Sequence, residues 1–288
     1  MTAAELKNVS YVYSKDTPFE KTAAADISVT FEKGLTTGII GHTGSGKSTV
    51  AQLINGLLKP SAGEVWVSGK NIWDEPKKIR DVRFRVGLVF QYPEYQLFEE
   101  TVRADIGFGP KNMGLDKEEI ETRVKEAARF VGISEDMLDR SPFDISGGQR
   151  RRVAIAGVIA MRPEILILDE PAAGLDPRGR DEILTKITEY RKETGSSIIM
   201  ISHSMEDMAK YCDKIFVMSG GRPYLYGTPS EIFSDEKRID SVGLTVPQVT
   251  QILQRLRDDG YDVDTSAYTV EAAKAEILRL IGGGKNAT

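Results

Sequence analysis

The sequence has one cysteine, no excess of basic residues and no long apolar run, and each absence excludes a class of protein. A lone Cys212 cannot form an intrachain disulfide, so a disulfide-stabilised secreted fold is excluded and a reducing compartment is favoured. A net charge of −5 argues against broad nucleic-acid binding, which usually requires a basic face. No apolar stretch approaches the roughly 20 residues that span a bilayer, and the best candidate, residues 153–161, is short and flanked by arginines.

The N-terminus also lacks the basic segment and apolar core of a signal peptide. If the chain works at a membrane, we therefore expect another protein to hold it there. What is present is an ordinary globular composition, 40% hydrophobic and 28% charged, in a chain of 288 residues. A charged, linker-like stretch at residues 235–238 predicts a boundary between a main domain, residues 1–234, and a small helical C-terminal extension, residues 235–288.

Strand and helix patterns predict a parallel α/β sheet in the main domain. Runs of β-forming residues predict strands at 9–12, 27–31, 35–40, 64–69, 86–90, 165–168, 197–201 and 214–218. Helical apolar spacing and capping residues predict helices at 48–58, 116–132, 148–161, 181–193 and from Ser204, where Asp207 completes a capping box. Strands and helices alternate beyond residue 160, which favours a parallel sheet. Two more helices are expected at 246–257 and 270–281.

The strongest motif is a phosphate-binding loop of the form G-x-x-x-x-G-K-[ST] at residues 41–48. Glycines let backbone N–H groups converge on phosphate oxygens, and the helix that follows directs its positive end at the same place. Lys47 supplies a charge for the β- and γ-phosphates, and the Ser48 hydroxyl can ligate Mg²⁺. A strand before and a helix after the loop argue against a chance match. We predict nucleotide binding by Gly41, His42, Thr43, Gly44, Ser45, Gly46, Lys47, Ser48 and Thr49, with no chemical role for His42.

An apolar strand at residues 165–168 delivers two carboxylates, Asp169 and Glu170, at its end. Asp169 is suited to hold Mg²⁺, and Glu170 to orient or deprotonate the attacking water. A single carboxylate there would be an ordinary acidic turn, but the upstream phosphate loop makes the functional interpretation the better one. His203 follows the strand at 197–201, where its imidazole can reach a γ-phosphate or the water; taken alone it would be a turn or capping residue.

Ser146, Gly147, Gly148 and Gln149 precede a predicted helix and form a second backbone anion site, here called the signature segment. The simpler interpretation is an ordinary N-cap. One nucleotide does not need two such helix starts from one chain, so the second suggests action on a neighbouring subunit's nucleotide.

These motifs resemble those of ABC ATPases. The phosphate loop, Gln91, the signature segment, Asp169-Glu170, Leu175-Asp176 and His203 occur in that family's order and spacing, over about residues 4–234. The resemblance implies an α/β, ABC-type P-loop NTPase: a mixed or parallel sheet core, an antiparallel β subdomain, a helical subdomain inserted at about 95–160 and the C-terminal extension. It implies ATP and Mg²⁺ as ligands, and two ATPase subunits that pack head to tail with each ATP between them.

By the same resemblance, individual residues receive roles. Tyr13 would stack on adenine, although Tyr11 is close by and an aromatic residue in a strand is usually core. Gln91 would sense Mg²⁺ and water and contact the transmembrane partner. Asp176 would lie at the subunit interface, and His203 would hold the γ-phosphate.

Residues 89–98, 108–112, 151–157 and 174–180 further resemble the ATPases of energy-coupling factor (ECF) importers, the last stretch being most like the second of their two ATPase types. Ala172 departs from the Thr or Ser that the family often has there. The resemblance implies uptake of vitamins or transition-metal ions. It also implies a related second ATPase (a heterodimer rather than a homodimer), a membrane scaffold, a substrate-binding membrane subunit and a peripheral position at the cytoplasmic face of the cell membrane. The extension would help the ATPase pair hold together.

Acidic residues after Gln91 offer contacts to basic groups of that scaffold, although a solvated acidic face is the simpler interpretation; they are Glu94, Glu99, Glu100 and Asp105. Two other functions compete with transport. A soluble ABC ATPase acting on DNA or ribosomes would usually carry long coiled coils or two ATPase domains, and a non-hydrolysing regulator would lack catalytic groups. We expect neither, and no nucleic-acid partner.

Overall fold

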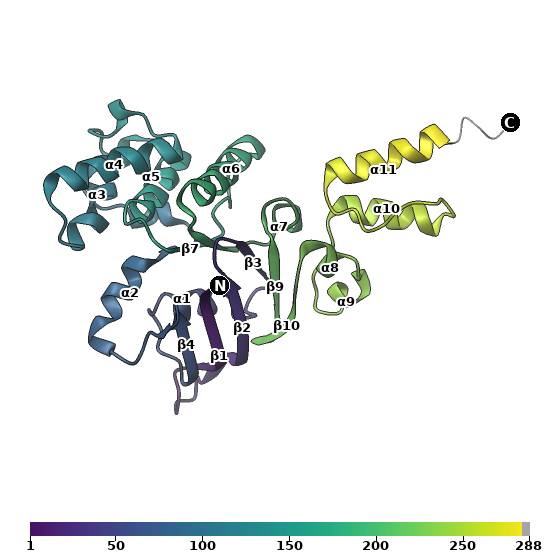
Figure 1. Ribbon diagram of the computed structural model, residues 1–288, viewed down its shortest axis with the longest axis horizontal. Helices are drawn as coiled ribbons and strands as arrows, with labels where there is room; N and C mark the ends of the chain where they lie inside the picture. The colour runs from purple at the N-terminus through teal and green to yellow at the C-terminus, as the bar shows by residue number, and fades with distance from the viewer. Residues whose placement is uncertain (284–288) are drawn as a thin grey trace.

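The computed structural model describes residues 1–283 and contains a six-stranded sheet of order β10-β9-β3-β8-β7-β6 (Figure 1). Its strands are β3 (Thr36–Ile40), β6 (Val86–Val89), β7 (Ile165–Asp169), β8 (Ser197–Ile201), β9 (Lys214–Ser219) and β10 (Arg222–Gly227). All neighbours pair in parallel except β10, which pairs antiparallel with β9. The carboxyl ends of β3, β6, β7 and β8 therefore meet at one edge of the sheet, where α/β proteins usually place ligands.

A second, antiparallel sheet has the order β2-β1-β4-β5, formed by β1 (Thr2–Tyr13), β2 (Lys21–Glu32), β4 (Ala62–Val67) and β5 (Lys70–Asn71). It packs with α1 (Lys47–Ile54) against one face of the six-stranded sheet through a core that includes Phe31, Leu53 and Phe216. Alternate residues of β7 and β8 face opposite sides: Ile167 joins this core, and Leu168 joins the core beneath the helices.

Three helices form a lobe above the edge of the sheet: α3 (Val102–Asn112), α4 (Lys117–Val131) and α5 (Gly147–Ile159) (Figure 1). Asp116 caps α4 through the Glu119 N–H, and Gly132 ends it in a left-handed conformation, as predicted. Short segments connect the elements: η1 (Pro76–Lys78), α2 (Ile79–Arg85), η2 (Pro93–Gln96), η3 (Glu135–Met137) and η4 (Pro142–Asp144). The sequence patterns missed α2, because seven residues are too few to display a helical repeat.

Helices α6 (Pro177–Thr194) and α7 (Met205–Tyr211) pack their apolar residues into the same core as α4 and α5. Helix α6 begins four residues before the predicted start at 181. Asp176 is its N-cap and Pro177 its first residue, a position where the missing N–H of proline costs nothing.

The C-terminal part contains α8 (Pro229–Phe233), α9 (Glu236–Asp240), α10 (Gln248–Asp258) and α11 (Val270–Gly283). The linker expected at 235–238 is wrong, because Asp235 caps α9 there. Ile239, Leu244 and Val246 join the main core, whereas Leu253, Val263 and Ala273 form a small core of their own between α10 and α11. Residues 284–288 of the expected extension lie outside the described residues.

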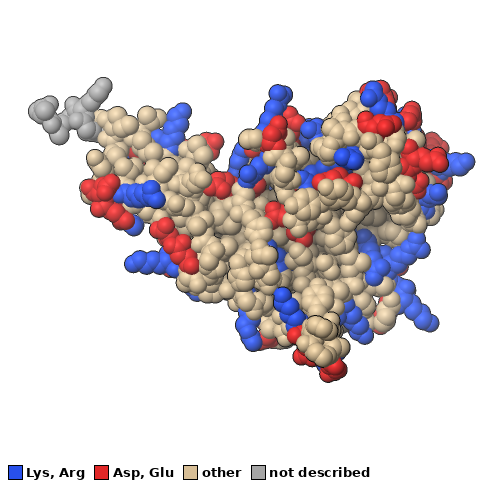
Figure 2. Space-filling model, turned by 180° about the vertical axis from the view of Figure 1, so that it is seen from behind, with Lys and Arg blue, Asp and Glu red and all other residues tan. Residues whose placement is uncertain are grey.

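Among residues 1–283, no helix has both the length and the apolar character needed to cross a bilayer. The face drawn in Figure 2 carries acidic and basic side chains around its edge, with uncharged atoms over much of its middle. That face is not uniformly basic, in keeping with the net charge of −5.

Candidate nucleotide site

The phosphate loop connects β3 to α1, which begins at Lys47. Gly46 has a φ of +98°, and a Cβ there would lie 2.3 Å from the Ala23 carbonyl oxygen, so only glycine fits. A Cβ on Gly41 would likewise lie 2.4 Å from the Met218 carbonyl oxygen. His42, Thr43 and Gly44 are exposed on the loop, and Ser45 is buried beneath it.

Lys47 extends back over this loop. Its Nζ donates hydrogen bonds to the carbonyl oxygens of Gly41 (2.7 Å) and His42 (3.0 Å). Burial lowers the pKa of the Lys47 ammonium, and the nearby carboxylates of Glu170 and Asp169 partly offset that effect. A cation held among loop carbonyls is placed to exchange those partners for phosphate oxygens.

Ser48 and Asp169 meet at the end of β7. The Ser48 hydroxyl donates a 2.6 Å hydrogen bond to Asp169 Oδ2. Burial raises the pKa of the Asp169 carboxyl, against the lowering effects of this hydrogen bond and of Lys47. A hydroxyl and a carboxylate beside a phosphate loop are hard oxygen donors of the kind Mg²⁺ prefers, so these residues fit that ion.

Glu170 is held in a strained position beside Asp169. Its φ of +53° is left-handed, and its N–H donates to the Ile201 carbonyl oxygen at 2.9 Å. Burial first, and the charge of Asp169 second, raise the pKa of the Glu170 carboxyl to about 7. Glu170 Oε1 lies 3.4 Å from His203 Nε2. A carboxylate with such a pKa is suited to accept a proton near neutral pH.

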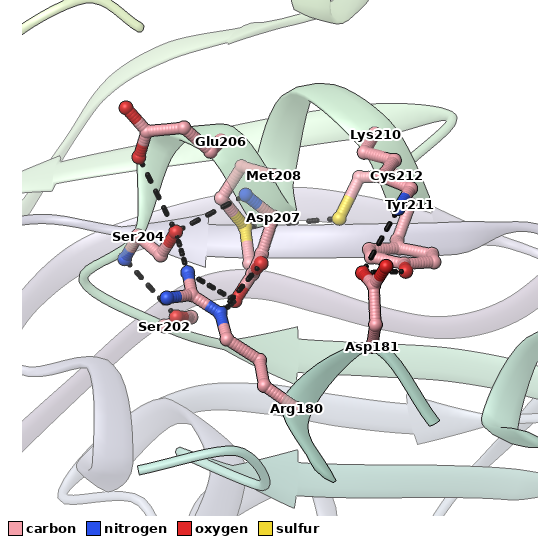
Figure 3. A network of polar contacts seen from close by, with 10 residues as sticks. All are labelled: Arg180, Asp181, Ser202, Ser204, Glu206, Asp207, Met208, Lys210, Tyr211 and Cys212. Carbon is pink, nitrogen blue, oxygen red and sulfur yellow. Dashed lines mark hydrogen bonds and ion pairs between the residues drawn. The ribbon is translucent and has the colours of Figure 1, made fainter. Parts of the chain in front are cut away.

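His203 lies two residues beyond the end of β8 and is half exposed. Burial, and then the charge of Lys47, lower the pKa of its imidazole, which favours the neutral form. The residues on either side of it, Ser202 and Ser204, belong to the polar network drawn in Figure 3.

Arg180 is the centre of that network. Its Nε lies 2.9 Å from each carboxylate oxygen of Asp207, and its Nη2 also bonds the Ser204 hydroxyl. The predicted capping box at Ser204 is half right: the Asp207 N–H donates to Ser204 Oγ at 3.1 Å, but the Asp207 carboxylate turns to Arg180 instead (Figure 3). The first turn of α6, which Asp176 caps, is thereby joined to the segment that carries His203. In the sequence, Arg180 is part of the stretch 174–180 that resembles ECF ATPases, and no local pattern there indicates this network.

Tyr13 lies at the end of β1 beside the phosphate loop. It lines a cavity of about 190 Å³ together with Gly44, Lys47 and Thr49, and its hydroxyl is 3.3 Å from Thr49 Oγ1. Tyr11, the alternative aromatic residue, packs against the core instead and touches Tyr13 edge to face. The structure thus shows that Tyr13, and not Tyr11, lines the cavity beside the phosphate loop, which the sequence could not distinguish.

Gln91 lies just beyond β6, at the same sheet edge as Asp169, and its side chain is exposed. The segment after it carries Tyr92, Tyr95 and Phe98, which are exposed together with Phe108 of α3. Tyr92 packs on Tyr95, and Phe98 packs edge to face on Phe108. We call these four residues the aromatic patch. Exposed aromatic clusters of this kind are typical of protein–protein contact sites.

The signature segment lies at the exposed start of α5. Ser146 and Gln149 form a reciprocal capping box, with hydrogen bonds of 2.9 and 3.3 Å. Among the described residues, no hydrogen bond or ion pair joins this segment to the phosphate loop of the same chain. Asp176 is exposed too, and its Oδ1 accepts a 2.7 Å hydrogen bond from the Gly179 N–H. Ala172 is partly buried and packs against the main core.

The geometry therefore brings Lys47, Ser48, Asp169, Glu170 and His203 together at one edge of the sheet. Comparisons with known proteins show which family the chain belongs to. The family described as ABC transporter matches residues 24–173 of this chain. The chain belongs to the ABC transporter family. The predicted ABC-type α/β fold is confirmed by solved structures.

Two curated relatives indicate to which type of ABC transporter protein this chain is similar. The "Energy-coupling factor transporter ATP-binding protein EcfA2" of Clostridium acetobutylicum is 54% identical over 98% of this chain and 99% of its own length. The protein of the same name from Caldanaerobacter subterraneus is 52% identical over 98% and 99%. This ABC ATPase is thus of the energy-coupling factor type, with ATP hydrolysis coupled to transport.

Two solved structures are similar as well. CbiO1 of Clostridium perfringens, described as part of the ABC transporter complex CbiONQ, has a TM-score of 0.75 and 40% identity, over 88% of this chain and 99% of that one. The ATP-binding cassette MJ0796, solved as a dimer bound to ADP and Pi, has a TM-score of 0.71 and 26% identity, over 78% and 98%.

Proposed function

We propose that this chain is the ATP-hydrolysing motor subunit of an ECF-type importer, which drives uptake of vitamins or transition-metal ions through partner membrane subunits. One observation carries the proposal: the phosphate loop, Asp169-Glu170 and His203 follow β3, β7 and β8 and converge at one sheet edge. This constellation supports hydrolysis as well as binding of ATP, which argues against a non-hydrolysing regulator.

Each residue then has a role in the ATP reaction. Lys47 binds the β- and γ-phosphates, Tyr13 stacks on adenine, and residues 41–49 surround the phosphates. Ser48, Gln91 and Asp169 hold Mg²⁺, which neutralises phosphate charge when bound. Glu170 accepts the proton of the attacking water, and the neutral imidazole of His203, 3.4 Å from Glu170, orients the γ-phosphate.

A second subunit completes the site. Ser146, Gly147, Gly148 and Gln149 stand at the exposed start of α5 and act on the partner's ATP, with Asp176 at the contact between subunits. The dimeric ATP-binding cassette MJ0796 supports a paired arrangement. The partner is a related but distinct ATPase. The extension from residue 235 helps the pair hold together, and Ile252, Leu278 and Ile281 expose apolar surface there.

The aromatic patch contacts the membrane scaffold, which keeps the chain at the cytoplasmic face of the cell membrane. Of the acidic residues expected to help, two have partners within the chain. Glu94 pairs with Arg151, and Asp105 accepts hydrogen bonds from the N–H groups of Phe98 and Glu99. Glu100 remains exposed. The scaffold contact is therefore mainly aromatic, with Asp105 shaping the segment that presents Phe98.

Co-purification tests this function. The tagged chain is isolated from detergent-solubilised membranes, and bound proteins are identified by mass spectrometry. We expect a membrane scaffold, a second related ATPase and Mg²⁺-dependent ATP hydrolysis by the assembly. As a control, a variant with Tyr95→Ser and Phe98→Ser should lose the scaffold but keep ATP binding. Ribosomal or nucleic-acid partners without a membrane protein would favour the alternative of a soluble ABC ATPase.

A further inference from the structure

Arg151 is a buried cation in the first turns of α5, with 2% of its surface exposed. Its Nε lies 3.3 Å from Glu94 Oε2, and its guanidinium lies 6.0 Å from the centre of the Tyr92 ring. Its Nη1 donates a hydrogen bond to the Ala173 carbonyl oxygen. One side chain of α5 therefore contacts two other segments that are far apart in the sequence, one with Tyr92 and Glu94 and one with Ala173.

Each of these segments adjoins a different part of the proposed machinery. Tyr92 and Glu94 follow Gln91 in the segment that presents the aromatic patch. Ala173 lies in the loop between Glu170 and Asp176. The helix that carries Arg151 starts with the signature segment, and a Cβ on Gly148 would lie 3.8 Å from Leu175 of the same loop. Arg151 therefore lies where the segment that presents the aromatic patch meets two other elements. These are the helix that starts with the signature segment and the loop that leads to Asp176 at the proposed subunit contact.

The buried guanidinium of Arg151 resists separation of the segments that it contacts. A buried charge is strongly disfavoured unless an opposite charge and hydrogen bonds compensate it, and Glu94 is the carboxylate within ion-pair distance of Arg151. A displacement of the Glu94 segment must therefore either carry Arg151 with it or leave a buried charge unpaired. The planar guanidinium also lies over the Tyr92 ring at 6.0 Å while it donates to Ala173, a combination that a compact ammonium group does not reproduce.

We propose that Arg151 is a positioning residue that couples the segment after Gln91 to the signature segment and to the loop that ends at Asp176. A push on the aromatic patch by the membrane scaffold is passed through the Glu94–Arg151 ion pair to the start of α5 and through the Ala173 hydrogen bond to Asp176. Arg151 itself touches neither ATP nor the scaffold. This inference rests on the proposed function, because it requires a scaffold that contacts the patch.

The test compares ATP hydrolysis by the purified membrane complex with hydrolysis by the ATPase pair without scaffold; the ratio of the two rates measures coupling without knowledge of the cargo. In the Arg151→Gln complex we expect this ratio to shift toward one by a factor of at least about ten. A factor of this size corresponds to the coupling energy between contacting residues. Equilibrium binding of ATP should stay near wild type. Arg151→Lys keeps the charge but loses the planar group that reaches Glu94, Tyr92 and Ala173 together, and it should be intermediate.

Arg152→Gln is the matched control, because Arg152 is the next residue of the same helix and pairs with Glu182 at the surface. Its ratio should equal that of wild type. Arg151→Met combined with Glu94→Leu replaces the buried pair by apolar groups; it should fold and assemble but remain uncoupled. The Arg151→Gln effect should not add to that of Glu94→Gln.

A normal ratio in assembled Arg151→Gln and Arg151→Met/Glu94→Leu complexes would overturn the inference, as would equal losses in Arg152→Gln. If the wild-type complex and the ATPase pair alone hydrolyse ATP at the same rate, the scaffold does not affect hydrolysis. That result would also overturn the inference that Arg151 couples the two. Failure of the proposed function has a different signature, because no membrane scaffold would then co-purify with the wild-type chain.

Discussion

The Ser48 hydroxyl and the Asp169 carboxylate lie 2.6 Å apart, although 121 residues separate them in the sequence. The hydroxyl comes from the start of α1 and the carboxylate from the end of β7. Together they offer one neutral and one charged oxygen beside the phosphate loop, which is the donor set expected for Mg²⁺.

This pair predicts that Ser48→Ala weakens binding of ATP only when Mg²⁺ is present. We expect an affinity loss of about 10- to 100-fold with Mg²⁺, the value of one hydrogen bond or ligand to a charged group. With EDTA the affinity should match wild type, and Ser48→Thr should restore the hydroxyl and the binding. Equal losses with and without Mg²⁺ would show that Ser48 acts on the nucleotide itself.

Glu170→Gln should bind ATP like wild type but lose roughly 10²–10⁴ in turnover, the usual contribution of a general base. The amide keeps the size of the side chain but cannot accept the proton of the attacking water. Single-turnover hydrolysis by the assembled complex measures the loss, with Glu193→Gln as an exposed control near the end of α6. Turnover near wild type would remove Glu170 from the mechanism.

The same substitution should stabilise the nucleotide-free protein at high pH. The unfolded chain ionises Glu170 near pH ~4.3, whereas the folded chain keeps its proton up to about pH 7. Ionised Glu170 therefore destabilises the fold above pH 7, and this penalty disappears as the pH falls toward the ordinary pKa. Relative to wild type, Glu170→Gln should gain up to about 3 kcal/mol at pH 8 and little at pH 5, by denaturant unfolding. A pH-independent gain would contradict the raised pKa.

Tyr13 predicts a stacking contribution to ATP affinity. Tyr13→Ala should weaken ATP binding by about 5- to 100-fold, since stacking of a base on an aromatic ring contributes ~1–3 kcal/mol. Tyr13→Phe keeps the ring, loses only the 3.3 Å contact to Thr49 and should bind nearly as well as wild type. Equal affinities of the alanine and phenylalanine variants would argue that no base stacks there.

The Arg180–Asp207 pair predicts a link between α6 and the position of His203. Arg180→Gln leaves the buried Asp207 carboxylate without its cation, and we expect a loss of ~1–3 kcal/mol in stability. We also expect a lower kcat, because Ser204, next to His203, loses its contact with Arg180. Asp207→Asn in the same chain should restore much of the stability but not the kcat, because the Arg180–Ser204 contact is still missing. Thermal unfolding and kcat are measured together.

Asp181→Asn serves as the comparison for that pair. Asp181 lies next to Arg180 and also bonds α7, through Lys210 and Tyr211, but it is exposed (Figure 3). Its loss should change stability by less than about 1 kcal/mol, as for a surface ion pair. If Asp181→Asn lowers kcat as much as Arg180→Gln, the Arg180 network has no special effect on His203.

The sequence by itself determined the local features of this protein. A phosphate loop requires glycines at fixed positions, and helix caps such as Asp116 and Gly132 act within one turn, so both can be identified from neighbouring residues. Apolar runs identified the buried strands β7 and β8 for the same reason. The family followed from the order of these motifs, and the comparisons confirm it.

Only the tertiary structure decided which distant residues meet. Sheet order places Asp169 against Ser48 and separates Tyr13, beside the phosphate loop, from Tyr11 in the core. Arg151 and Arg180 sit in charged stretches that are indistinguishable from solvated surface in sequence, because charge patterns do not reveal burial. Packing pairs the buried Arg151 with Glu94 and the half-buried Arg180 with the buried Asp207. A buried charge takes such a partner because its desolvation must be offset.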